Sequence, residues 1–151
     1  MKTLSFLFVS FLAFSCATKK NASTTGNNAD SSSETKELMI TANIGENAGK
    51  SDPFTISAVS VQGNIMTLDV SYSGGCAEHV FQVIGSASIA KSMPAIRSVQ
   101  LVHKSNGDAC KKMIMQKIKV DIKALAYKQT SGSEIYLSLQ GWKDRIKYTF
   151  E

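Results

Sequence analysis

The chain has 151 residues and a net charge of +5, with 43% hydrophobic and 19% charged residues. This length supports one domain with one buried core, and the hydrophobic content excludes a chain that is disordered throughout. The basic excess is too small for the dense patch of a nucleic-acid binder, so we expect no nucleic-acid partner. The chain has only two prolines, and Val, Ile, Ser and Thr are plentiful, which favours strands over helices.

Residues 1–15 have the layout of a secretory signal peptide. Lys2 is followed by an apolar run from Leu4 to Phe14 and then by small residues. The run is too short to span a membrane, which takes about 20 residues. The sequence therefore predicts export.

Cys16 follows the apolar run directly and precedes polar, low-complexity sequence. This arrangement resembles the signal of bacterial lipoproteins. The resemblance implies that Cys16 becomes the lipidated first residue of the mature protein and anchors it in the cell envelope, at the outer membrane or in the periplasm. Leu12 and Phe14 depart from the family's pattern, because the leucine stands one place early and a small residue is usual at position 14. Ala13 and Ser15 also fit an ordinary cleavage site, which would leave a secreted soluble protein.

Residues 16–36 form the predicted tether. After Cys16 this stretch contains no large apolar side chain, so it cannot bury enough surface to offset chain entropy and is expected to be disordered. A flexible coil of about 20 residues spans roughly 25 Å between its ends. This span suits a stalk that holds a domain away from lipid headgroups.

Residues 37–151 carry the predicted folded domain. Short apolar runs alternate with Gly, Asn and Ser, without the 3.6-residue period of helices. The clearest feature is a hairpin in which residues 53–61 pair with residues 66–72 across a Gly-Asn turn. Further strands are expected at residues 38–44, 78–84, 98–103, 114–123, 135–139 and 142–150, with a looser connection at residues 86–94.

Seven or eight short strands at regular spacing indicate an all-β fold. The best match is an antiparallel β-sandwich, immunoglobulin-like in size. A small β-barrel is the alternative.

Three cysteines in an exported chain leave one without an internal partner. If Cys16 carries lipid, Cys76 and Cys110 remain, and an oxidising compartment favours a disulfide between them. Such a bridge would connect the start of one strand with the loop that leads into another.

The same residues allow a second interpretation, a structural zinc site. Cys76, His79, His103 and Cys110 supply two sulfurs and two imidazoles, a ligand set that zinc uses, and Asp108 lies nearby in the sequence. Both histidines, however, share strand faces with apolar residues, which favours hydrogen-bonded structural roles. A catalytic cysteine with a histidine base has no local signature here. Apart from this zinc alternative, no cofactor is expected.

The stretch from Gly74 to Phe81, followed by Leu101–His103 and Asn106–Cys110, resembles a Gly-Gly-Cys-x-x-His-x-Phe pattern of small uncharacterised bacterial lipoproteins. The resemblance covers about a third of the predicted domain and implies no established activity. It does imply pairing of Cys76 with Cys110.

Two further features bear on function. A basic edge is expected at one strand, either as a solvated face that discourages aggregation or as a contact for anionic polysaccharide or lipid; it comprises Lys111, Lys112, Lys117, Lys119 and Lys123. Trp142 is expected in the core rather than as a stacking platform for a ligand. The sequence thus favours a non-enzymatic, membrane-anchored binding or structural module, whose partner would be an envelope protein or anionic polysaccharide. The alternatives are a zinc-binding envelope protein and a small secreted inhibitor or enzyme.

Overall fold

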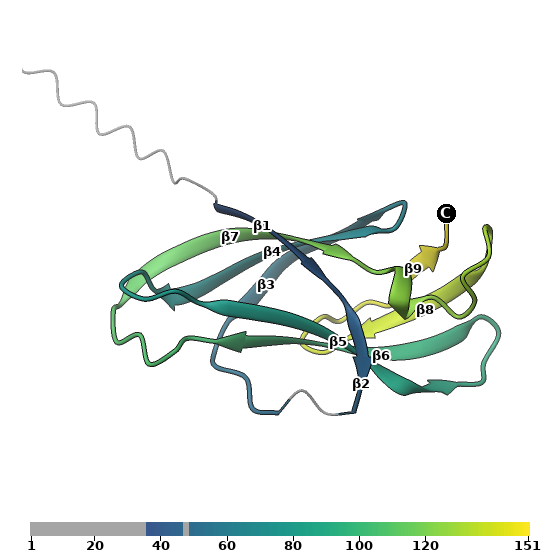
Figure 1. Cartoon of the computed structure of the whole chain (residues 1–151), viewed down its shortest axis with the longest axis horizontal. Coiled ribbons are helices and arrows are strands. Elements are labelled where there is room, and N and C mark those ends of the chain that lie inside the picture. Colours follow the sequence, from purple (N-terminus) through teal and green to yellow (C-terminus); the bar gives the residue numbers. More distant parts are fainter. Residues whose placement is uncertain (1–35, 47–48) are drawn as a thin grey trace, which may run out of the picture. The chain divides into compact units, whose positions relative to one another are not determined.

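The computed structural model describes residues 36–46 and 49–151. The expected signal peptide, the lipidation site at Cys16 and the tether up to residue 35 lie outside these residues. The described part is almost entirely β-structure (Figure 1), with one short 3₁₀ helix, η1, at Lys123–Leu125.

The strands of this described part form two packed sheets (Figure 1). Sheet 1 has the order β1-β7-β4-β3, and sheet 2 has the order β2-β5-β6-β8-β9. Neither sheet closes on itself, so the predicted β-sandwich is confirmed and the barrel alternative is wrong. The strands are β1 (Lys36–Thr41), β2 (Asn43–Gly45), β3 (Thr55–Gln62), β4 (Ile65–Gly74), β5 (Val80–Ala90), β6 (Ala95–Lys104), β7 (Lys112–Asp121), β8 (Glu134–Leu139) and β9 (Ile146–Thr149).

The sheets are mixed, whereas the sequence predicted antiparallel sheets. The pairs β1–β7, β2–β5 and β6–β8 are parallel, and the other pairs are antiparallel. The hairpin prediction holds, because β3 and β4 pair around the turn at Gly63 and Asn64. The parallel pairs join strands that are far apart in the chain, and local sequence patterns do not encode such pairings.

Residues 38–44 were predicted as one strand, but they belong to both sheets. The chain leaves sheet 1 after Thr41 and enters sheet 2 at Asn43. Between them, Ala42 is 1% exposed and its N–H donates to the Asp121 carbonyl at 2.8 Å. A small buried residue therefore marks the crossing between the layers.

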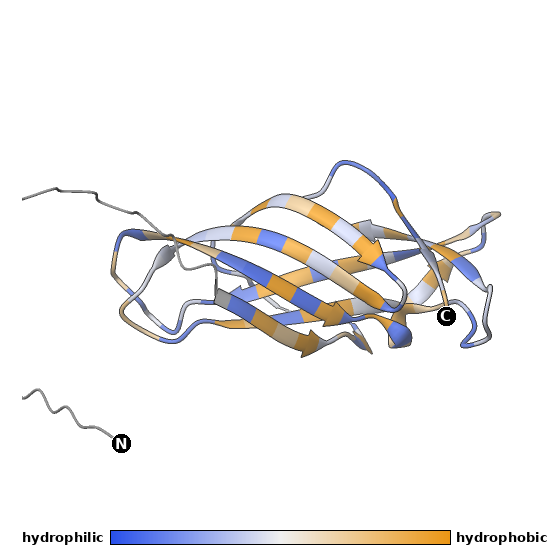
Figure 2. Cartoon of the chain, turned by 90° about the horizontal axis from the view of Figure 1, so that it is seen from above, coloured by the Kyte–Doolittle hydropathy of each residue, from blue (hydrophilic) through white to orange (hydrophobic). Residues whose placement is uncertain are grey.

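Alternation along the strands builds the core, as the banded ribbons of Figure 2 show. In β4, Met66, Leu68, Val70 and Tyr72 are buried, and the residues between them are only partly buried. β7, in sheet 1, and β8, in sheet 2, show the same period, so each sheet turns an apolar side toward the core. Full burial of one such aliphatic side chain stabilises the fold by about 1.5–3 kcal/mol.

The stretch predicted as a looser connection at residues 86–94 is mostly strand. β5 continues to Ala90 and pairs again with β6 at Ile89 and Arg97, after a shift in register beyond Gly85. Ser86, Ala87 and Ser88 lack the apolar alternation that would have marked this half of the strand. Strand pairing with β6 overrides their weak propensity.

The lysine-bearing strand was predicted to lie at the edge of a sheet, and this prediction is wrong. β7 lies between β1 and β4, so it is an inner strand of sheet 1. Lys117 pairs with Asp69 at 3.2 Å, and Lys119 pairs with Glu37 at 2.9 Å. These carboxylates neutralise the middle of the lysine row and weaken the expectation of an anionic-polysaccharide contact there. Trp142 packs partly buried against the core, as expected, although the closing strand begins only at Ile146.

Candidate functional site

The predicted cysteine–histidine cluster forms at one end of the sandwich, where the β4–β5 loop meets the β6–β7 loop. Cys76 and Cys110 form a disulfide with their Cα atoms 5.9 Å apart, as the cysteine count predicts. Because the two sulfurs are bonded to each other, they cannot act as thiolate ligands. The zinc alternative with Cys76, His79, His103 and Cys110 is therefore not formed. For the same reason, neither sulfur is a free thiolate that could act as a nucleophile.

The Gly-Gly pair before the disulfide serves two different purposes. A Cβ atom at Gly74 would lie 2.5 Å from ring atoms of His79, so only glycine leaves space for the imidazole. Gly75 has a φ of 107°, a backbone conformation that L side chains rarely adopt. The pair therefore turns the chain tightly enough for Cys76 to reach Cys110.

Asp108 holds the two loops together with its carboxylate. Oδ2 accepts the N–H groups of Gly75, Cys76 and Ala77 at 2.8–2.9 Å, and Oδ1 accepts that of Cys110 at 2.8 Å. These donors, with the Cys110 N–H contributing most, hold the pKa of Asp108 well below its usual range. An ionised carboxylate thus ties together the backbone at both ends of the disulfide.

The two histidines form a hydrogen-bonded chain that ends on Asp108. His103 Nδ1 lies 3.2 Å from the Pro53 carbonyl, and His79 Nε2 lies 3.1 Å from Asp108 Oδ2. Both of these oxygens only accept, so each nitrogen must carry a proton. The rings face each other through His79 Nδ1 and His103 Nε2 at 2.7 Å.

The contact between the rings joins the Pro53 carbonyl, the two histidines and Asp108 in one continuous chain. Burial, followed by the charge of His79, lowers the pKa of His103.

Aromatic side chains enclose the pair. Phe81 stacks on His103 with centroids 4.6 Å apart, and Tyr72 lies 4.6 Å from the His79 ring and 4.9 Å from the His103 ring. The Tyr72 hydroxyl donates to Gln116 Oε1 at 2.7 Å. His103 is 1% exposed, so the pair is part of the packed end of the core, as the strand-face argument predicted.

A third segment, Ser51 and Asp52, forms hydrogen bonds with the backbone of His103; the sequence analysis did not identify it. The His103 N–H donates to Ser51 Oγ at 3.0 Å, and the Asp52 N–H donates to the His103 carbonyl at 2.9 Å. The Asp52 carboxylate accepts both the N–H and the hydroxyl of Ser105 at 2.7 Å, which lowers its pKa. No local pattern marks Asp52, because its partner is 53 residues away in the chain.

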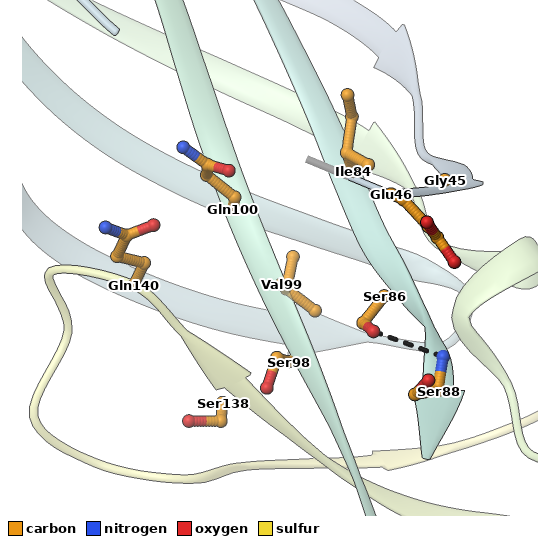
Figure 3. A pocket seen from close by; sticks show the side chains of 10 residues that line it. All are labelled: Gly45, Glu46, Ile84, Ser86, Ser88, Ser98, Val99, Gln100, Ser138 and Gln140. Carbon is orange, nitrogen blue, oxygen red and sulfur yellow. Dashed lines mark hydrogen bonds between the residues drawn. The ribbon is translucent and has the colours of Figure 1, made fainter. Parts of the chain in front are cut away.

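The outer face of sheet 2 carries a hollow of about 540 Å³ that the sequence analysis also missed (Figure 3). It lies over β5, β6 and β8, beside the end of β2. Polar uncharged side chains dominate its lining. The lining residues are Gly45, Glu46, Ile84, Ser86, Ser88, Ser98, Val99, Gln100, Ser138 and Gln140.

Comparison with known proteins identifies the fold alone. No family model and no curated protein matches the sequence. Among solved structures, a NigD-like immunity protein from Bacteroides caccae matches 74% of this chain, with a TM-score of 0.57 and 16% identity. A protein of unknown function from Bacteroides vulgatus matches 78% of this chain, with a TM-score of 0.48 and 8% identity. This chain spans 58% of the length of each of these proteins.

The match to the Bacteroides caccae structure thus concerns the fold of the sandwich. Among residues 36–46 and 49–151, which the structure describes, no helix has the length and hydropathy that crossing a membrane requires.

Proposed function

We propose that the chain is a lipid-anchored lipoprotein of the cell envelope that acts as a non-enzymatic binding module. One observation carries the binding role. The groups best suited to chemistry, namely Asp108, the two histidines and the two cysteines, are already engaged with one another by the disulfide and by hydrogen bonds at the end of the sandwich. The open hollow on sheet 2, in contrast, presents polar side chains to solvent.

The sequence supports the anchor. An apolar run followed by Cys16 and a polar stretch is the layout of a lipoprotein signal. Each buried CH₂ of an acyl chain contributes about 0.8 kcal/mol, so more than one chain holds a protein on a membrane without a spanning helix. The Cys76–Cys110 disulfide is consistent with an exported protein, because disulfides persist in oxidising compartments.

A fractionation experiment tests the anchor. We expect the wild-type chain to partition with membranes and to carry acyl mass on Cys16. The Cys16→Ala variant should lose both properties. A double variant, Cys76→Ala with Cys110→Ala, removes the disulfide without touching the signal, and it should partition as the wild type does. Unchanged partitioning of Cys16→Ala would overturn the proposal.

The competing functions have less support. A zinc-binding role would use sulfurs that the disulfide occupies. The Bacteroides caccae structure is described as an immunity protein, but a likeness at 16% identity concerns the fold, so the proposal names no toxin partner. No observation favours a secreted inhibitor or an enzyme over the binding module.

A further inference from the structure

The hollow on sheet 2 is lined by side chains that can form further hydrogen bonds. Ser86 Oγ accepts the N–H of Ser88 at 3.1 Å, the contact drawn as a dashed line in Figure 3. The four side chains of Ser98, Ser138, Gln100 and Gln140 have no such partner within the described part of the chain, and none is buried away from solvent. These groups are therefore available to a ligand.

Strand register arranges these groups in two rows. Ser98 lies opposite Ser138 in the parallel β6–β8 pair, and Val99 lies opposite Leu139. Gln100 is the next residue after Val99 in β6, Gln140 is the first residue after β8, and their side chains point to the same side (Figure 3). One row thus offers hydroxyls and the next offers amides, and neighbours within a row are about 4.8 Å apart across the strands.

The charge of the lining limits the class of ligand. Of the described residues around the hollow, Glu46 alone is charged, and no cation is among them. An anionic ligand would meet repulsion from this carboxylate without any compensating pair. Serine hydroxyls and glutamine amides both donate and accept, which matches the hydroxyl groups of a sugar.

We propose that the hollow binds an uncharged oligosaccharide that lies across β5, β6 and β8. This inference rests on the binding role proposed above and specifies its ligand. Because no aromatic ring is among the described residues that line the hollow, stacking does not contribute, and the affinity is expected in the millimolar range. The inference also replaces the anionic polysaccharide that the lysine row had suggested.

An NMR titration of the full chain tests the proposal with two probes, a neutral β-glucan hexamer and an oligogalacturonate hexamer. The neutral hexamer should shift the backbone amides of residues 98–100 and 138–140. The anionic hexamer should bind at least tenfold more weakly. Equal binding of the two probes, no saturable shift, or shifts confined to other strands would overturn the inference.

A double variant, Ser98→Val with Ser138→Val, removes one row of hydroxyls with side chains that suit strands. It should weaken binding of the neutral hexamer at least tenfold. Ser60→Val, at an exposed position of β3 in sheet 1, is the matched control and should bind as the wild type does. Unchanged affinity in a folded double variant would contradict the assignment. A chain that partitions with membranes but binds no neutral hexamer would retain its proposed anchor and lose only this inference.

Discussion

Removal of the Cys76–Cys110 disulfide should destabilise the domain by about 4 kcal/mol. The bridge spans 34 residues, and closing a loop of this length removes roughly 12–13 cal/mol/K of entropy from the unfolded chain. Asp108 bonds to the backbone N–H of both Cys76 and Cys110, so the two loops should stay in place without the covalent bond. We therefore expect the loss to arise in the unfolded state.

Urea unfolding of the Cys76→Ala, Cys110→Ala double variant measures this loss. The free energy of unfolding should fall by about 4 kcal/mol and the m-value should rise, because the uncrosslinked unfolded chain exposes more surface. The melting temperature should fall by roughly 10–15 °C. Cys16→Ala changes the third cysteine without opening the bridge and should unfold as the wild type does. A loss below about 1 kcal/mol in the double variant would refute the entropy argument.

Two further predictions concern buried polar groups. The pKa of His103 is lowered by burial, so stability should be complete above pH ~6.5 and should fall as the pH drops through the His103 pKa in the folded state. Denaturation midpoints between pH 8 and 5 measure this slope, and its survival in His103→Gln would contradict the assignment. Arg97 is 6% exposed and donates to the carbonyls of Leu125, Ser86 and Ala126. Arg97→Met should therefore cost about 2–4 kcal/mol in urea unfolding, and a cost as small as that of the exposed control Arg145→Met would refute this role.

The sequence predicts the fold class and most core positions, because alternation is a local property. The buried residues of β4 and of β8 are the ones that alternate in the sequence. Neither the crossing at Ala42 nor the inner position of β7 could be predicted this way. Both depend on which strands pair, and the partners of β1 and β7 are far apart in the chain.

The candidate site was likewise predicted only where local features of the sequence suffice. The odd cysteine count and the strand faces of the two histidines predict the disulfide and the buried imidazoles. Asp108 was considered only as a helper of a metal ligand, although it is the centre of the hydrogen-bond network. The hollow on sheet 2 could not be predicted, because Ser98 and Ser138 become neighbours only through the parallel β6–β8 pair.

The crossing at Ala42 has a mechanical consequence. Force on a tethered domain would enter at Lys36 and run along β1, which pairs in parallel with β7 from Lys36–Gln116 to Thr41–Asp121. Tension along this strand loads all of its backbone hydrogen bonds in shear, so they share the force and do not open one at a time. β2 continues the same segment into the opposite sheet, so detaching the N-terminal strands requires rupture in both layers. The domain should therefore resist a force applied at Lys36 along the strands far better than a force applied across them.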